Sequence, residues 1–133
     1  MQSKVVLDTN FICSLLNRHD VNHKAAKLLY TEYCEDSVII IPVVVKVELL
    51  GIKELLSFRE KTLRFVETIA NRTQYIDKNF FDRFKAFVLS TPILLKPIDS
   101  LVLYTAFQHD ALLLTFDKKV RKEVKRLEGK TLD

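Results

Sequence analysis

The sequence predicts an α/β domain built around a parallel sheet. Short apolar runs that suit buried strands alternate with longer stretches in which apolar residues recur at helical spacing. Two of these runs, residues 38–41 and 112–114, contain no polar residue, which is typical of strands covered on both faces. With 133 residues, 48% of them hydrophobic, the chain is expected to form a single domain, residues 1–133, with a substantial core.

The first half of the chain contains one ambiguous segment, residues 43–51. Its valines favour a strand, whereas Pro42 before it and Gly51 at its end favour a helix, and we expect a helix. Elsewhere the pattern is clearer, because apolar residues are either consecutive or spaced as in an amphipathic helix. The expected elements are strands at residues 5–7 and 38–41, helices at 11–16, 23–33 and 43–51, and one long or broken helix at 53–70.

The second half contains a helix whose phenylalanines share one face, at residues 80–88. Such a face suits a core or dimer contact, although aromatic rings interleaved with basic residues can also stack on single-stranded RNA. Residues 93–97 are expected to form a turn that leads to Asp99 and a mostly buried helix. The other expected elements are strands at 73–76 and 112–115, a basic helix over about 120–127 that ends at Gly129, and a short tail from residue 130.

The composition excludes several classes of function. Only two glycines are present, so a phosphate-binding loop, a dinucleotide-binding loop or a nucleophile elbow cannot be built. Cys13 and Cys34 lack the spacing of a zinc or redox motif and are expected to be free thiols. His19 and His23 stand four residues apart but have no third ligand nearby, so we expect surface histidines. Without a membrane-length apolar run or a signal-peptide pattern, a soluble, cytoplasmic protein is expected.

Basic residues gather at the C-terminus of a chain whose net charge is +4. A cluster of this kind attracts nucleic-acid phosphates through counterion release, although a solvated helix face would have the same composition. The candidates for contacts with an RNA backbone are Lys118, Lys119, Lys122 and Arg126.

Four acidic residues are placed to meet at one edge of the predicted sheet. Asp8 and Asp117 each follow a buried strand, and the carboxyl ends of parallel strands emerge at the same edge. Asp99 and Glu48 lie at or within helices that begin near that edge, and Glu48 stands among apolar residues. The aspartates could instead cap helices, a role that is compatible with a functional one.

Converging carboxylates indicate a bound cation. Two unit charges ~4 Å apart repel by about 4 kcal/mol at an effective dielectric constant of 20, so four carboxylates need protons or cations between them. Oxygen-only ligands suit Mg²⁺ or Mn²⁺. Such an ion can activate water and stabilise charge on a phosphodiester. Metal-dependent hydrolysis of a phosphodiester is therefore a plausible chemistry for these residues.

The acidic positions resemble those of the PIN-domain nucleases. The matching motifs are VVLDTN at residues 5–10, VEL at 47–49, IDS at 98–100 and TFD at 115–117, and their order and spacing agree over essentially the whole chain. The resemblance implies a three-layer α/β/α fold with a parallel sheet of four or five strands, and hydrolysis of RNA with Mg²⁺ or Mn²⁺. It assigns metal binding and catalysis to Asp8, Glu48, Asp99 and Asp117, and supporting polar roles to Asn10 and Thr115.

The resemblance also implies partners. Many small members of this family are VapC-type toxins, which are commonly homodimers and are blocked by a cognate antitoxin. A housekeeping RNA-processing nuclease would have the same site, and a non-cleaving RNA-binding or scaffold protein would keep the acids but depend on the basic helix. Phosphotransfer of the haloacid dehalogenase kind is disfavoured, because that chemistry wants a second acid two residues after Asp8, where this chain has Asn10.

Overall fold

A parallel five-stranded sheet forms the middle layer of the protein, whose computed structural model describes residues 3–53 and 57–132. The strands are β1 (Lys4–Leu7), β2 (Val38–Pro42), β3 (Arg72–Gln74), β4 (Leu112–Leu114) and β5 (Lys130–Thr131). Their order in the sheet is β3-β2-β1-β4-β5, and each neighbouring pair is parallel. The predicted parallel sheet is confirmed.

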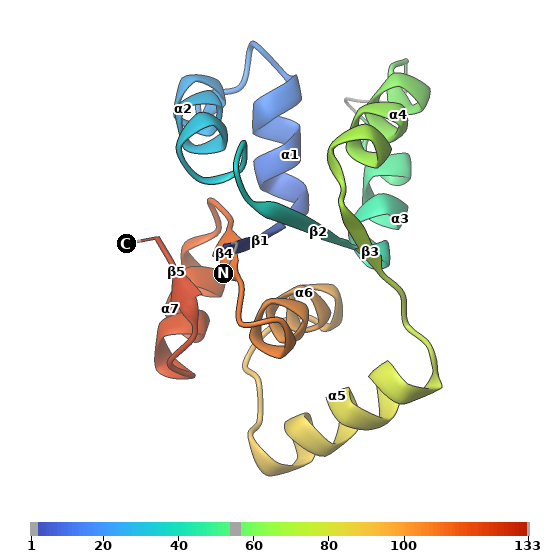
Figure 1. The fold of residues 1–133 in the computed structure, drawn as a ribbon, viewed down its shortest axis with the longest axis vertical. Coiled ribbons are helices and arrows are strands. Elements are labelled where there is room, and N and C mark those ends of the chain that lie inside the picture. The colour runs from blue at the N-terminus through green and yellow to red at the C-terminus, as the bar shows by residue number, and fades with distance from the viewer. Residues whose placement is uncertain (1–2, 54–56, 133) are drawn as a thin grey trace.

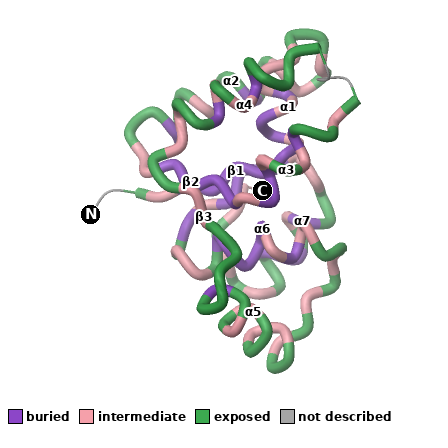
Figure 2. Tube along the Cα trace, turned by 90° about the vertical axis from the view of Figure 1, so that its right-hand side faces the viewer, coloured by how far each residue is buried: buried purple, intermediate pink, exposed green. Residues whose placement is uncertain are grey.

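Helices cover both faces of the sheet and complete the three-layer α/β/α fold (Figure 1). One side carries α1 (Thr9–Leu16), α2 (His23–Tyr33), α3 (Val43–Gly51) and α4 (Arg59–Ile69). The other carries α5 (Lys78–Ser90), α6 (Pro97–Gln108) and α7 (Lys118–Arg126). The central strands and much of α6 are buried, whereas α5 is mostly exposed or half-buried (Figure 2). No helix in residues 3–53 or 57–132 is long and apolar enough to cross a membrane.

The centre of the core is the trio of strands β2, β1 and β4. Val6 pairs with Ile40 on one side and with Leu113 on the other, and all three side chains are completely buried. Continuous apolar runs are stable here because helices shield both faces of the sheet from water. The core thus fixes where β1 and β4 end, and those two ends position the site.

The ambiguous segment at residues 43–51 is the helix α3, as expected. Pro42 closes β2 in an extended conformation and occupies the N-cap position, so the helix begins directly after it. Val44, Val45 and Leu49 are buried, whereas Val47 is 61% exposed, so only one side of this valine-rich helix meets the core. Burial of that side outweighs the preference of valine for strands.

The segment predicted as one long or broken helix, residues 53–70, contains helix α4 (Arg59–Ile69). Helix α4 begins only at Arg59, after a turn at residues 57–58, and residues 54–56 lie outside the described part of the chain. The strand predicted at 73–76 is β3, which runs from Arg72 to Gln74, and Tyr75 beyond its end is 61% exposed.

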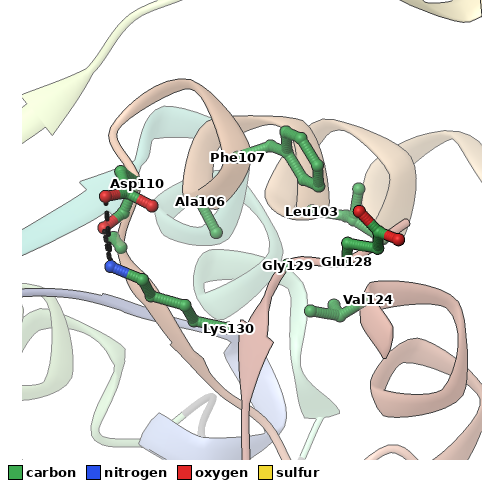
Figure 3. Close-up of a pocket in the computed structure, with 9 residues that line it drawn as sticks. Leu103, Ala106, Phe107, Asp110, Val124, Glu128, Gly129 and Lys130 are labelled. Carbon is green, nitrogen blue, oxygen red and sulfur yellow. Dashed lines mark hydrogen bonds and ion pairs between the residues drawn. The ribbon is translucent and has the colours of Figure 1, made fainter. Parts of the chain in front are cut away.

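The C-terminal segment is a strand, and the prediction of a tail from residue 130 was wrong. Lys130 and Thr131 pair in parallel with Leu112 and Leu113 and form the edge of the sheet. The Lys130 ammonium lies 3.1 Å from the carboxylate of Asp110, in the loop before β4 (Figure 3). Two paired residues are too few to show a strand pattern in sequence, so only the exposed edge of β4 explains why this segment docks.

Gly129 ends the last helix through close packing and not through a left-handed backbone. Its amide donates to the carbonyl of Val124 at 2.8 Å, and a Cβ atom at position 129 would lie 2.9 Å from Cγ1 of Val124. The left-handed residue is its neighbour Glu128, with φ of 61°. These residues border a small cavity of about 60 Å³ between α6 and β5 (Figure 3).

The aromatic face of α5 packs against α6. The rings of Phe80, Phe84 and Phe87 have centroids 5.4, 5.5 and 5.3 Å from that of Tyr104. Most of this face is therefore a contact between two helices of the same chain, whereas Phe81, 51% exposed, lies outside it. Phe80, Phe84 and Phe87 therefore pack inside the protein and do not form an RNA-stacking surface.

Candidate functional site

The site lies where the order of strands changes direction. The chain passes from β1 to β2 and β3 on one side of the sheet, and then places β4 and β5 on the other side of β1. At such a switch point the connections diverge from the carboxyl ends of the strands and leave a crevice, where open α/β sheets bind ligands. Asp8 directly follows β1, and Thr115 directly follows β4.

Asp8 is the most buried acid of the site, at 3% exposure. It is the N-cap of α1, and its Oδ1 accepts a hydrogen bond from the backbone N–H of Thr9 at 2.8 Å. Its Oδ2 accepts hydrogen bonds from the Thr115 hydroxyl at 2.8 Å and from the Asn10 amide at 3.3 Å. Asp8 is therefore a helix cap, and it also faces the crevice.

Burial raises the pKa of Asp8 from 3.8 to about 6. Loss of hydration is the largest cause, and the nearby charges of Asp99 and Glu48 raise the pKa further. Hydrogen bonds from Thr115 and Thr9 oppose the shift. Ionisation of Asp8 is thus unfavourable in the metal-free protein, and a bound cation would offset that free-energy cost.

Asn10 and Thr115, the predicted supporting residues, join the two loops that border the crevice. The Asn10 carbonyl oxygen accepts a hydrogen bond from the backbone N–H of Phe116 at 2.9 Å, and its amide donates to the Thr115 hydroxyl oxygen at 3.1 Å. The same hydroxyl oxygen accepts from the backbone N–H of Asp117 at 3.1 Å. This network fixes the orientation of the Asp8 carboxylate, which Thr115 contacts directly.

Glu48 reaches the crevice from α3. Its Oε1 accepts a hydrogen bond from the hydroxyl of Thr9 at 2.6 Å. Glu48, Asp8 and Asp99 line one hollow of about 560 Å³, which extends along α1 and which we call the acidic pocket. Thr9 was missed in the sequence, because a residue that follows a helix cap carries no sign of a partner 39 positions away.

Asp99 and Asp117 line a second hollow, of about 600 Å³. Asp99 lies in the first turn of α6 but does not cap it, because Lys96 holds the N-cap position. Asp117 is the N-cap of α7, and its Oδ1 accepts from the backbone N–H of Lys119 at 2.8 Å. Since Asp99 also lines the acidic pocket, the two hollows meet at its side chain.

The charges of the acids raise the pKa values of Asp8 and Asp99, but the four side chains do not already surround a metal-binding position. Burial, followed by the charges of Asp117 and Glu48, raises the pKa of Asp99. Within residues 3–53 and 57–132, however, no three His, Cys, Asp or Glu side chains are already gathered closely enough to enclose a metal ion. The donor set is nonetheless all carboxylate oxygen, which fits Mg²⁺ or Mn²⁺, and Mg²⁺ binds through one or two carboxylates while it keeps several waters.

Lysines border the second hollow, which we call the lysine pocket. Lys118 and Lys119, both predicted to contact RNA, are exposed beside Asp117. Lys122 is also exposed on α7 but does not line this hollow. The sequence did not single out Lys96. It lines the lysine pocket, and its positive charge partly opposes the rise in the pKa of Asp99.

Arg126, which is predicted to contact RNA, holds a loop against α7 in the structure. Its Nε donates to Oε1 of Glu123 at 2.6 Å, and one Nη donates to the carbonyl of Pro92 at 2.8 Å. Glu123 is 5% exposed, and its other oxygen accepts from the backbone N–H of Leu94 at 2.5 Å. The hydrogen bond from Arg126 lowers the pKa of Glu123. The geometry therefore gives Arg126 a structural partner, which its position in a basic cluster did not reveal.

Arg121 is another residue that the sequence did not single out. Its Nε donates to the carbonyl oxygen of Thr115 at 2.7 Å, and its guanidinium lies 5.8 Å from the ring centroid of Phe116. The Phe116 ring also stacks with Phe11 at 5.7 Å. Arg121 thus braces the turn after β4 that carries Asp117.

Cys34, His19 and His23 line neither the acidic pocket nor the lysine pocket. No disulfide joins Cys13 and Cys34, as predicted, and burial raises the pKa of the Cys34 thiol to about 12. A thiol with such a pKa is a poor nucleophile near neutral pH. His19 is exposed, whereas the His23 ring Nδ1 lies 2.8 Å from the carbonyl of Ser14 at the base of the α1–α2 turn.

Comparison with known proteins agrees with the resemblance in the sequence. The family model described as "PIN domain" matches residues 5–126. No protein of curated function matches this chain in sequence.

Several solved structures share the fold. The VapC20 toxin of Mycobacterium tuberculosis, described as cleaving the sarcin–ricin loop, has a TM-score of 0.66 at 15% identity, over 89% of this chain and 93% of that one. A toxin–antitoxin complex from Klebsiella pneumoniae has a TM-score of 0.70 at 21% identity, over 97% and 96% of the two chains. The PIN-domain endonuclease Utp24 has a TM-score of 0.54 at 22% identity, over 98% and 85%. The family match spans most of the chain and the fold agrees with it: this protein belongs to the PIN-domain family of nucleases.

Proposed function

We propose that this protein is a divalent-metal-dependent endoribonuclease. Asp8, Glu48, Asp99 and Asp117 would hold Mg²⁺ or Mn²⁺ beside the scissile phosphodiester. The observation that carries the proposal is the meeting of two pockets at Asp99, which brings carboxylates from four separate segments to the switch point of a PIN-domain sheet.

The protein's own side chains would prepare the site before substrate binds. Thr115 and Asn10 orient the Asp8 carboxylate, and Thr9 orients that of Glu48. Orientation by such hydrogen bonds removes part of the reorganisation that the reaction would otherwise require. When bound, the metal supplies a Lewis acid for the phosphoryl oxygens and a water with a lowered pKa.

The lysine pocket would bind the phosphates of the RNA strand. Lys96, Lys118 and Lys119 line it, next to Asp99 and Asp117. Cations at this position attract an anionic strand and offset the repulsion between its phosphates and the acids. The pocket therefore supplies affinity where the carboxylates alone would repel the substrate.

We propose further that the protein is the toxin of a toxin–antitoxin pair and forms a homodimer. Support comes from the similar fold in the Klebsiella pneumoniae toxin–antitoxin complex and in the VapBC2 structure from Rickettsia felis, which has a TM-score of 0.59. Exposed apolar side chains on the α1–α4 side are available for contact with a protein partner. They include Val21, Leu28, Val47 and Phe58.

Cleavage of RNA by the purified protein tests the nuclease proposal. The wild-type chain should cut single-stranded RNA with Mg²⁺ or Mn²⁺, and both EDTA and Asp99→Asn should abolish cutting. Asp82→Asn, the same change at a surface residue of α5, is the control and should cut normally. Cleavage that survives both EDTA and Asp99→Asn would contradict the proposal.

Expression in a bacterial host separates a toxin from a housekeeping nuclease. A toxin should arrest growth, and Asp99→Asn should relieve the arrest. Normal growth at the same level of active wild-type protein would favour the second candidate, a housekeeping RNA-processing nuclease.

A further inference from the structure

Asp99 is the acid of the site whose position depends most on the segment that carries it. The other three acids each accept a hydrogen bond that orients the carboxylate. Within residues 3–53 and 57–132, the structure contains no such bond to the Asp99 side chain, which lies in the first turn of α6. The position of the Asp99 carboxylate therefore follows from where α6 begins. The loop between α5 and α6, residues 91–96, leads to that point.

Two residues of α7 hold this loop, and we call them the Glu123–Arg126 clamp. Glu123 is 5% exposed, and its Oε2 accepts a hydrogen bond from the backbone N–H of Leu94. Arg126 donates to both carboxylate oxygens of Glu123 and also to the carbonyl oxygen of Pro92. The clamp thus contacts the loop backbone at two positions.

The clamped loop is bonded in turn to the first turn of α6, which carries Asp99. The Ser100 hydroxyl donates to the carbonyl oxygen of Lys96 at 3.0 Å and lies 3.3 Å from that of Leu95. The backbone N–H of Ser100 donates to the same Lys96 carbonyl at 2.9 Å. Pro97, at the start of the helix, has a fixed φ. Movement of the loop would therefore move Asp99 with it.

The helix that supplies the clamp also begins with another acid of the site. Asp117 is the N-cap of α7, and its Oδ1 accepts from the backbone N–H of Lys119. Because Glu123 lies on the same helix, the clamp ties the loop before Asp99 to the helix that follows Asp117. Asp99 and Asp117 line the same pocket. The clamp therefore joins two acids that come from different segments of the chain.

Stability alone does not require an ion pair at this place. A buried carboxylate loses hydration, and apolar side chains of similar volume often replace a buried ion pair without loss of stability. The Arg126 side chain is 46% exposed, so water partly screens its attraction to Glu123. Apolar side chains could fill the same space, but they could not form directional hydrogen bonds to the loop backbone.

We infer that Glu123 and Arg126 are positioning residues for the metal site: they hold residues 91–96 against α7 and so set where Asp99 lies relative to Asp117. The inference rests on the proposed metal-dependent function. Substitution of residues that orient metal ligands typically lowers metal affinity or activity by about 10- to 100-fold. Loss of the clamp should therefore weaken binding of Mn²⁺ and lower kcat for RNA cleavage, each by about tenfold or more.

A double variant that keeps the net charge tests the inference. Glu123→Met together with Arg126→Met removes one charge of each sign and the hydrogen bonds to Pro92 and Leu94. The freed N–H of Leu94 can bond to water, because Leu94 is 75% exposed, and the melting temperature should fall by no more than a few degrees. Calorimetric titration without RNA should show about tenfold weaker binding of Mn²⁺. Unchanged Mn²⁺ affinity and kcat in the folded double variant would overturn the inference.

Three single variants separate positioning from charge and from stability. Arg126→Gln removes a positive charge, which by long-range attraction alone would tighten binding of a cation, whereas loss of the bond to Pro92 should weaken it. Lys122→Gln removes the same charge from an exposed position of α7 and should not weaken Mn²⁺ binding. Val66→Ala opens the core beneath α4, on the other side of the sheet, and should lower stability without changing the Mn²⁺ affinity of the folded protein (Figure 1). Equal losses of affinity in Val66→Ala and the double variant would overturn the inference.

Failure of the inference and failure of the nuclease proposal give different results. If wild type and double variant bind Mn²⁺ and cut RNA equally well, only the positioning role is overturned. If the wild-type protein binds Mn²⁺ but does not cut RNA, the nuclease function is overturned, while weaker Mn²⁺ binding by the double variant still supports the inference. A wild-type protein that binds no Mn²⁺ would overturn both.

Discussion

The two pockets of the crevice differ in how their charges are held. In the acidic pocket, Asp8 is 3% exposed and accepts hydrogen bonds from Thr9, Asn10 and Thr115, and its pKa is raised to about 6. In the lysine pocket, Lys118 and Lys119 are exposed and flank a half-buried Asp117. A buried charge loses hydration free energy but is held in a fixed orientation. An exposed charge keeps its hydration, but water and salt screen its interactions. The first condition suits chemistry at a cation, and the second suits attraction of a polyanion.

Substitution of Asp8 should have the largest effect on activity. Asp8→Asn removes the charge of the most buried acid and should lower kcat for RNA cleavage by about 100-fold or more. Asp117→Asn, in the exposed pocket, keeps the cap acceptor for α7 and should cost less, about tenfold. Single-turnover cleavage at saturating Mg²⁺ measures both. A greater loss for Asp117→Asn than for Asp8→Asn would reverse the comparison between the pockets.

Substitution of Asp8 should lower activity but increase the stability of the metal-free protein. Because its pKa is about 6 in the folded state and near 3.8 when unfolded, the folded state binds more protons between these values. Asp8 therefore lowers the free energy of unfolding as pH rises from about 4 to 6. Asp8→Asn should raise that free energy by up to about 3 kcal/mol at pH 7 and by little at pH 4.

Urea unfolding in EDTA at the two pH values checks this gain. Asp82→Asn controls for the removal of an aspartate charge from the surface. A loss of stability at pH 7 in the Asp8→Asn protein would show that the buried carboxylate is compensated within the chain.

Arg126 and Lys122 should separate a structural charge from a substrate-binding one. Arg126→Gln leaves the buried carboxylate of Glu123 without its ion pair, so the melting temperature should fall by several degrees while the salt dependence of RNA binding stays unchanged. Lys122→Gln removes the same charge from an exposed position and should do the reverse. If Arg126→Gln and Lys122→Gln changed the salt dependence of RNA binding equally, Arg126 would also contact RNA.

The exposed lysine pocket should give the smallest effects. Lys118→Gln and Lys119→Gln should each weaken RNA binding about equally for all sequences and lower the slope of log K against log salt by about 0.7. Titrations between 50 and 300 mM salt on identical oligonucleotides, in EDTA, measure the slope. A change in base preference instead would show that these lysines contact bases and not only phosphates.

Much of the site follows from sequence because it depends on where strands end. The apolar run before Asp8 and that before Thr115 define two central strands, and parallel pairing then brings their carboxyl ends together. The resemblance to PIN-domain nucleases supplied the positions of Glu48 and Asp99, which pattern alone left open between a cap, an exposed edge and a ligand.

Other parts of the site depend on contacts that no local pattern contains. The hydroxyl of Thr9 meets Glu48 only because α1 and α3 pack together, and Lys96 borders the lysine pocket only because Glu123 and Arg126 hold its loop. A basic residue in a sequence reveals its charge but not its partner, which is why the sequence did not show the hydrogen bonds of Arg126 to Glu123 and Pro92. The strand β5 was missed for a similar reason, since docking onto β4 and not composition makes it a strand.

Calorimetric titration of Mn²⁺ into the RNA-free protein tests the central claim most directly. The wild-type protein and Asp82→Asn should bind Mn²⁺ saturably at pH 7.5 and more weakly at pH 5, where protons compete for a carboxyl with a pKa of about 6. Asp8→Asn should lose most of this binding at pH 7.5. Identical isotherms for the wild-type and Asp8→Asn proteins would contradict a metal site at the end of β1.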